Sequence, residues 1–170
     1  QGGVGPEKAK LFLADEILGS FSCETLSPID RLFEKPSWRL TLPAGVSDMA
    51  ALDALSAKVN QLHPGASNLF AQEEVQRWLT KRGGAGQRNA LVANEIEVLP
   101  VVPGTRSSSE SFQREALRHR GLEPAQMIDV ALLCVAYSCT AHGQDLLKGC
   151  SIRAPGTSYF LQHLQGVSSV

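Results

Sequence analysis

The sequence predicts a mostly α-helical fold, namely a single-domain bundle of six or seven helices with one or two short extended segments. Apolar residues recur at helical spacing in several segments that end at Gly or Pro. Residues 127–141 form a nearly unbroken apolar run, which is typical of a helix buried on all sides. A chain of 170 residues that is 43% hydrophobic and 19% charged is large and apolar enough to fold as one domain, placed here over residues 1–170.

Two helices and an extended segment are expected near the N-terminus. Pro6 and Gly19 bracket the first helix, because Pro is favoured at the first helical position and Gly just after the last. Ser27 and Pro28 are typical of an N-cap followed by the first residue of a short helix. Residues 38–42 alternate apolar and polar side chains, which predicts a short strand.

Two amphipathic helices are expected in the middle of the chain. Ser47 is the predicted N-cap of the first, which carries apolar residues at helical spacing and ends at residues 63–65. The second is expected to start at Ser67 or Asn68 and to end at the glycine cluster 83–86. We interpret residues 83–88 as a hinge or sub-domain boundary, because glycine-rich stretches interrupt regular structure.

The C-terminal half is predicted from its apolar pattern and from the positions of Gly and Pro. The expected elements are a short strand at 95–98, a flexible loop at 103–111, a helix over 112–120, a central helix from Pro124 that continues to Leu147, and a last short helix from Thr157 or Ser158 to Leu164. The central helix is the rod against which the other helices would pack.

Charge is unevenly distributed along the chain although the net charge is only −1. Residues 1–76 carry six basic and ten acidic side chains, a net −4, whereas residues 77–120 carry eight basic and four acidic ones, a net +4. We expect the basic segment to pair with the acidic one, and the alternative is an anionic partner such as nucleic acid. The candidate nucleic-acid-binding residues are Arg77, Lys81, Arg82, Arg88, Arg114, Arg118 and Arg120.

The four cysteines indicate a reducing compartment, which we take to be the cytoplasm, because they are too few for a disulfide scaffold at this length. Cys134 and Cys139 would point about 140° apart on one helix, so they do not chelate one ion. Cys139 and His142 could face one ion, but they supply two ligands where a structural zinc needs four, and Cys150 would add only a third. We therefore predict no metal and no cofactor. Burial should make Cys139 unreactive, and Cys23, in the polar loop predicted at 20–24, is the thiol expected to be exposed.

No membrane-spanning segment and no signal peptide are predicted. The apolar run 127–141 is shorter than the roughly 20 residues that a transmembrane helix needs. The first residues contain neither a basic region nor an apolar stretch. Because residue 1 is Gln and not Met, we expect either a processed product or a fragment.

The pattern from Phe112 to residue 164 resembles a viral coat-protein core. Phe112 precedes a helix that carries Met127, then Cys139, then Gly143 four residues later, and the turn at 156–158 leads into a further helix. This arrangement is similar to the core of coat proteins of flexible filamentous plant viruses. The resemblance implies helical self-assembly around RNA with the basic segment near phosphate, and it assigns no residue as an RNA ligand.

The sequence departs from that family in three respects. Residues 144–145 are Gln and Asp where the family has paired small polar residues, and the spacing from Met127 differs by one. The chain also stops where the RNA-contacting half of the family would continue.

The function favoured by the sequence is a non-enzymatic helical domain that acts through protein–protein contact or self-association. A Gly-x-Ser-x-Gly elbow, a His-Glu-x-x-His motif and a phosphate-binding loop are all missing from the sequence, and no catalytic residue is assigned. One alternative is a nucleic-acid-packaging protein of the coat or nucleocapsid kind. The other is a cysteine-dependent enzyme, in which a thiolate would act as nucleophile.

Overall fold

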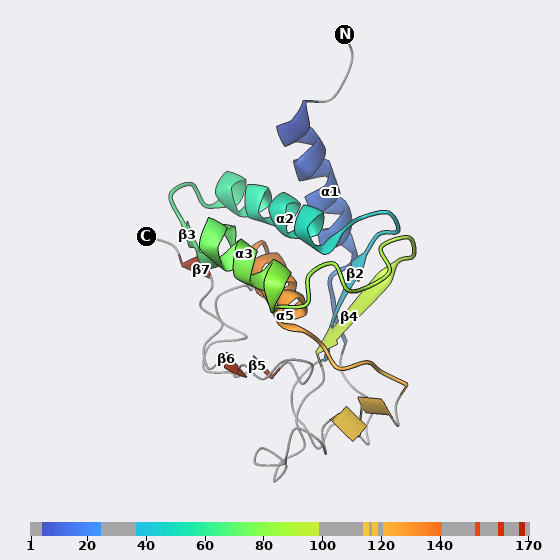
Figure 1. The fold of residues 1–170 in the computed structure, drawn as a ribbon. Coiled ribbons are helices and arrows are strands. Elements are labelled where there is room, and N and C mark those ends of the chain that lie inside the picture. Colours follow the sequence, from blue (N-terminus) through green and yellow to red (C-terminus); the bar gives the residue numbers. More distant parts are fainter. Residues whose placement is uncertain are drawn as a thin grey trace.

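The computed structural model describes residues 5–24, 37–98, 114–115, 117–118, 121–140, 152–153, 160–161 and 167–168. The elements are α1 (Pro6–Ser20), β1 (Ser22–Glu24), β2 (Ser37–Leu42), α2 (Asp48–Leu62), β3 (Ser67–Asn68), the 3₁₀ turn η2 (Leu69–Ala71), α3 (Glu73–Lys81), β4 (Asn94–Val98), α5 (Met127–Ser138), β5 (Ile152–Arg153), β6 (Phe160–Leu161) and β7 (Val167–Ser168). Figure 1 shows the helices gathered beside a small sheet.

The sheet is antiparallel and has the strand order β1-β2-β4. Strands β2 and β4 pair over five positions, from Trp38 opposite Val98 to Leu42 opposite Asn94. Because side chains alternate along a strand, Leu40, Leu42 and Ile96 lie in the core with the helices, whereas Arg39 lies on the other face. On that face Arg39 forms ion pairs with Glu95 and Glu97 at 3.3 and 3.5 Å.

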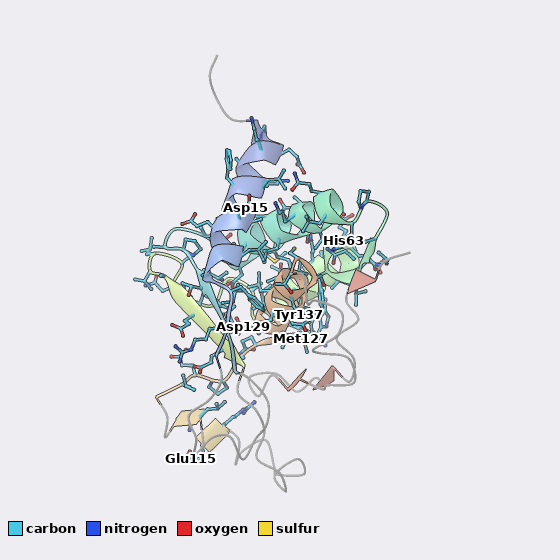
Figure 2. All side chains as sticks on the ribbon, turned by 180° about the vertical axis from the view of Figure 1, so that it is seen from behind. Asp15, His63, Glu115, Met127, Asp129 and Tyr137 are labelled. Carbon is cyan, nitrogen blue, oxygen red and sulfur yellow. The ribbon has the colours of Figure 1, made fainter. Side chains whose placement is uncertain are left out.

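Helix α5 is the centre of the core, as the sequence predicts. Each of its residues from Met127 to Tyr137 is buried. Helices α2 and α5 lie in contact, and His63 Nε2, just after α2, is 3.3 Å from the carbonyl oxygen of Ser138 at the end of α5. Figure 2 labels Met127, Asp129 and Tyr137 on α5, in the middle of the molecule, and His63 beyond the end of α2.

Helix α1 is joined to both α2 and the sheet. Lys10 pairs with Asp53 at 2.9 Å, and Lys58 pairs with Asp15 at 2.8 Å. At the end of α1 the Ser20 hydroxyl accepts a hydrogen bond from the backbone N–H of Thr41 on β2, at 2.9 Å. This hydrogen bond fixes the C-terminal end of α1 against β2.

The prediction of a bundle of six or seven helices is wrong. The described part of the chain contains four α-helices and a three-stranded antiparallel sheet, so its architecture is mixed α and β. The segments at 37–42 and 94–98 were expected to be extended, but their pairing joins residues more than fifty positions apart. Alternation within five residues shows that a strand can form and does not reveal its partner.

Several predicted boundaries also need correction. Residues 22–24, predicted as a polar loop, form strand β1 against β2. Asn68 caps the 3₁₀ turn η2, and α3 starts only at Glu73. Helix α5 starts at Met127 and ends at Ser138, so it is shorter than the helix expected from Pro124 to Leu147. Residues 160–161, predicted as helix, form strand β6 against β5.

Other predictions are confirmed. Helix α1 matches the expected helix from Pro6, and the Ser47 hydroxyl caps α2 by accepting from the Ala50 N–H at 3.2 Å. The predicted helix at 28–33, the flexible loop at 103–111 and residues 141–147 of the central helix lie outside the described residues.

Candidate functional site

The surface feature of greatest interest is a pair of uncharged loops at one end of the sheet. Residues 43–46 follow β2 and residues 90–93 precede β4, and neither stretch contains a charged side chain. The Gly45 N–H donates a hydrogen bond of 2.6 Å to the Ala90 carbonyl, so the loops lie side by side (Figure 1). We name residues 43–46 and 90–93 the apolar tip.

Two large apolar side chains of the apolar tip face solvent. The exposed fraction is 83% for Leu91 and 52% for Val92. Single exposed apolar residues are common on protein surfaces and need no explanation. Two adjacent exposed apolar residues in an uncharged loop are a better sign of a contact surface, because a partner could bury them without removing any charge of the loop from water.

The loop that carries Leu91 and Val92 is held by its own polar side chains. The Asn89 side chain accepts a hydrogen bond from the Leu91 N–H at 3.0 Å. The Asn94 amide donates to the carbonyl oxygens of Asn89 and Val92 at 2.9 and 3.0 Å. These bonds fix the backbone on both sides of the two apolar side chains, so a partner would meet a loop that is already ordered.

The same loop is attached to the core through Arg88, which bridges two carboxylates. Arg88 Nε lies 2.7 Å from Asp48 Oδ1, and its Nη2 contacts Asp129 Oδ1. The exposed fractions of the side chains are 20% for Arg88, 1% for Asp48 and 11% for Asp129. The Arg88–Asp48 contact is an ion pair at short distance without the alignment of a hydrogen bond.

The two carboxylates also serve the helices that carry them. Asp48 is the first residue of α2, and its Oδ2 accepts from the Gly86 N–H at 3.0 Å. Asp129 lies in the first turn of α5 and accepts from the Gln126 N–H at 2.8 Å in a capping box. Both charges lie near the positive end of a helix dipole. Arg88 thus joins the starts of α2 and α5 to the loop that leads to the apolar tip.

Arg88, in the basic segment 77–120, therefore forms an ion pair with Asp48, in the acidic segment 1–76. A contact of this kind is expected from the charge distribution along the chain. Among the other candidate nucleic-acid residues, Arg77 forms an ion pair with Glu73 at 3.1 Å on α3. Lys81 is the last residue of the same helix, and Arg82 follows it directly. Arg118 pairs with Glu115 at 3.7 Å. Nucleic-acid binding by these residues stays a prediction, and Arg120 lies outside the described residues.

A second feature is a solvent-open pocket of about 600 Å³ before the start of α5. We name it the arginine pocket, and its lining residues are Arg114, Arg118, Leu122, Glu123, Pro124 and Gln126. The helical turn that carries the arginines ends at Gly121, whose φ is +72°, and the Leu122 N–H donates to the Leu117 carbonyl at 2.9 Å. This is a Schellman-type helix end, in which a glycine with positive φ lets the chain reverse direction.

The glycine cluster, interpreted above as a hinge, packs closely against neighbouring elements. The Gly83 carbonyl accepts from the Ile128 N–H of α5 at 2.9 Å. A Cβ on Gly83 would lie 2.7 Å from Leu79 Cα, and one on Gly84 would lie 2.5 Å from Gln126 Cβ. Glycine is needed at these two positions because the backbone lies too close to Leu79 and Gln126 to leave room for a Cβ. A hinge motion over residues 83–88 stays a prediction.

The described cysteines of α5 and of its C-terminal turn do not have the environment of a nucleophile. Burial raises the pKa of both Cys134 and Cys139 to about 12. For Cys139, desolvation is the largest cause of the raised pKa; the charge of Lys58 opposes it and that of Asp15 adds to it. A thiol with such a pKa is neutral near pH 7, so it is a poor nucleophile. Cys23 lies on β1 opposite Trp38.

We expect Cys139 in the folded protein to react with iodoacetamide about a thousandfold more slowly at pH 8 than in the unfolded chain. The reason is that the pKa rises from 9.0 to about 12, so the thiolate fraction falls by three powers of ten. Site-resolved mass spectrometry of labelled peptides, with and without denaturant, measures both rates. Equal rates in the two states would contradict the burial of this thiol.

Within the described residues, no group of three or more His, Cys, Asp or Glu side chains is placed to hold a metal ion. In the same part of the chain, the helices are too short or too polar to cross a bilayer. Comparison with protein-family models, with curated proteins and with solved structures finds no significant match to this chain. The resemblance to coat proteins of filamentous plant viruses therefore stays a prediction.

Leu91 and Val92 were not among the residues singled out from the sequence. The signal that was present is the uncharged stretch Asn89–Asn94, which lies between Arg88 and Glu95 and lacks the spacing of a helix or a strand. Leu91 and Val92 would be taken for core residues on composition alone, and only the fold shows that they face solvent.

Proposed function

We propose that this chain acts without catalysis, by contact with another protein, and that the apolar tip is its contact surface. The observation that carries the proposal is the exposure of Leu91 and Val92 on a loop whose backbone is already fixed. The helical architecture assumed from the sequence is replaced by the mixed fold described above. The proposal keeps the reducing cytoplasm as the location, since the cysteines suit it.

The energetic case rests on burial of side chains at low ordering cost. Full burial of a Leu or Val side chain contributes roughly 1.5–3 kcal/mol. A flexible loop would lose part of that gain as conformational entropy on binding. Here Asn89, Asn94 and the Arg88 ion pairs order the loop before any partner arrives. An exposed, uncharged apolar loop of this kind fits an apolar pocket on the partner.

A photo-crosslinking amino acid placed at position 91 tests the proposal directly in the full chain. We expect one dominant crosslinked protein, either a second copy of this chain or another protein, identified by mass spectrometry. The matched control is position 62 at the end of α2, because Leu62 is also an exposed apolar residue, with 44% of its surface accessible. Crosslinking that is equal at positions 91 and 62, or absent at both, would overturn the proposal.

The double substitution Leu91→Ser and Val92→Ser should weaken the crosslinked complex at least tenfold while leaving the fold intact. Both side chains are exposed in the free protein, so their removal costs the core nothing. Sedimentation or light scattering over a concentration series measures the affinity when the partner is a second copy. The substitution Leu62→Ser is the control, and an unchanged affinity in the tip variant would contradict the assignment.

A further inference from the structure

We infer that the partner of the apolar tip is a different protein that adds an extended basic segment to the outer edge of β4, as a fourth strand of the sheet. The inference rests on the proposed function and names the kind of partner. The loop that carries Leu91 and Val92 leads directly into β4, which begins at Asn94 (Figure 1). The edge of β4 and the apolar tip are therefore neighbouring parts of one surface.

Strand β4 lies at the edge of its sheet. The strand order is β1-β2-β4, so β2 pairs with one side of β4. Within the described residues, no backbone hydrogen bond joins β4 to any element other than β2. Alternate N–H and C=O groups of an edge strand point away from the sheet, where an added strand can pair with them. The backbone of β4 can therefore bind an extended segment.

The side chains beside this edge carry more negative than positive charge. Glu95 and Glu97 both pair with Arg39 of β2, at 3.3 and 3.5 Å, on the face of the sheet away from the core. One guanidinium thus serves two carboxylates, and one negative charge is not balanced within this group. The side chain of Glu95 is the more open, with an exposed fraction of 52% against 19% for Glu97.

A basic segment would supply the missing positive charge. The glutamates lie on β4 itself, whereas Arg39 lies one strand further from the edge. An added strand is therefore closer to the two carboxylates than to the guanidinium, and attraction outweighs repulsion. Lys or Arg opposite a glutamate in a neighbouring strand stabilises the pairing.

The partner segment should alternate basic and apolar residues. Side chains that are opposite one another in paired strands lie on the same face of the sheet. Residues beside Glu95 and Glu97 would therefore face solvent, whereas the residue beside Ile96 would lie on the side of the core, where Ile96 itself is buried. An apolar side chain suits that position.

A second copy of this chain fits the same edge poorly. Antiparallel pairing of two β4 strands about Ile96 would place Glu95 of each copy opposite Glu97 of the other. A parallel pair would place each glutamate beside its counterpart. Like charges opposite one another destabilise a strand pair. The charge pattern of β4 therefore favours a different protein.

Fluorescence anisotropy of a labelled short peptide that alternates lysine and valine, titrated with the full chain at low ionic strength, tests the inference. We expect saturable binding. Methylation of the backbone nitrogens of the peptide should weaken binding about tenfold or more, because it removes the hydrogen-bond donors of the added strand and keeps the charge. Equal binding of the methylated peptide, or no measurable binding at millimolar peptide, would overturn the inference.

The double substitution Glu95→Gln and Glu97→Gln should weaken peptide binding about threefold to tenfold, the loss expected for two opposite-charge pairs in a sheet. The matched control is Glu73→Gln with Glu74→Gln on α3, which removes the same charge near one arginine, Arg77. It should leave the affinity unchanged, and circular dichroism verifies that both variants keep the fold. Equal affinity of the two double variants contradicts the inference, as do dimers in sedimentation that the peptide fails to dissociate.

Crosslinking from position 91 distinguishes failure of the inference from failure of the proposed function, because Leu91 lies outside β4. If position 91 captures a protein and the peptide does not bind, the apolar tip remains the contact surface and only strand addition is refuted. If position 91 captures no more than position 62, the proposed function is refuted and the inference with it.

Discussion

Replacing Arg88 by alanine is expected to lower the free energy of unfolding by roughly 3–5 kcal/mol, because it leaves two buried carboxylates without their counter-charge. Asp48 is almost fully buried and Asp129 is nearly so. Neither has another cationic partner among the contacts of the described residues, although each accepts a backbone hydrogen bond. Urea denaturation followed by circular dichroism measures the change.

The control for this prediction is Arg77→Ala on α3. Arg77 forms an ion pair of ordinary length with Glu73, but both side chains are mostly exposed, so its loss should have only a small effect. The comparison separates the removal of an arginine from the removal of a buried counter-charge. A loss below about 1 kcal/mol for Arg88→Ala would show that the bridge contributes little to folding.

The loss of Arg88 should also affect the apolar tip, since the arginine anchors the loop that leads to Leu91. Residues Asn89 and Asn94 would still form their local hydrogen bonds, so the loop would keep its turns but lose its attachment to α2 and α5. Hydrogen exchange of the amides at 86–93 reports this directly. We expect faster exchange there in the variant than in the native chain.

The substitution Gly84→Ala is expected to destabilise the protein by roughly 2–5 kcal/mol, from two costs that add. Gly84 has φ of +84°, a conformation that a residue with a Cβ adopts at a penalty of about 1–2 kcal/mol. The new Cβ would also lie 2.5 Å from Gln126 Cβ and 2.6 Å from its Cγ. Gln126 Cβ is bonded to the backbone of the N-cap of α5, so it cannot swing aside.

The matched control is Gly65→Ala. Gly65 has nearly the same φ, +81°, but a Cβ there would meet nothing within 4 Å. It should therefore show the conformational cost alone, and the difference between the two variants isolates the steric contact between the glycine cluster and α5. Equal losses of stability in the two variants would mean that this contact relaxes freely.

Much of the helical structure could be predicted from the sequence because its signals are local. Ser47 caps α2 at the position expected from its hydroxyl, and Pro6 starts α1. The burial of α5 follows from a run with one charge, and that charge, Asp129, caps its own helix. Each of these outcomes depends on residues within one or two turns of each other.

The sheet and the candidate sites could not be predicted in the same way, because they depend on contacts between distant residues. Trp38 pairs with Val98, and Arg88 meets Asp48 and Asp129 forty or more positions away. From the sequence, Arg88 was grouped with the basic residues expected at the surface, because the identity of a residue does not indicate whether its charge will form a buried ion pair. Leu91 lies outside the core cluster and is 83% exposed, which no local feature of its uncharged loop reveals.

By itself, then, the sequence determined that α1, α2 and α5 are helical, where α1 and α2 begin, and that α5 is buried on all faces, since hydrogen bonds and apolar spacing within a helix are set by near neighbours. Only the tertiary structure decided which strands pair, which arginine is enclosed and which apolar loop stays in water. Those outcomes follow from the packing of α2, α5 and the sheet against one another, which no local pattern encodes.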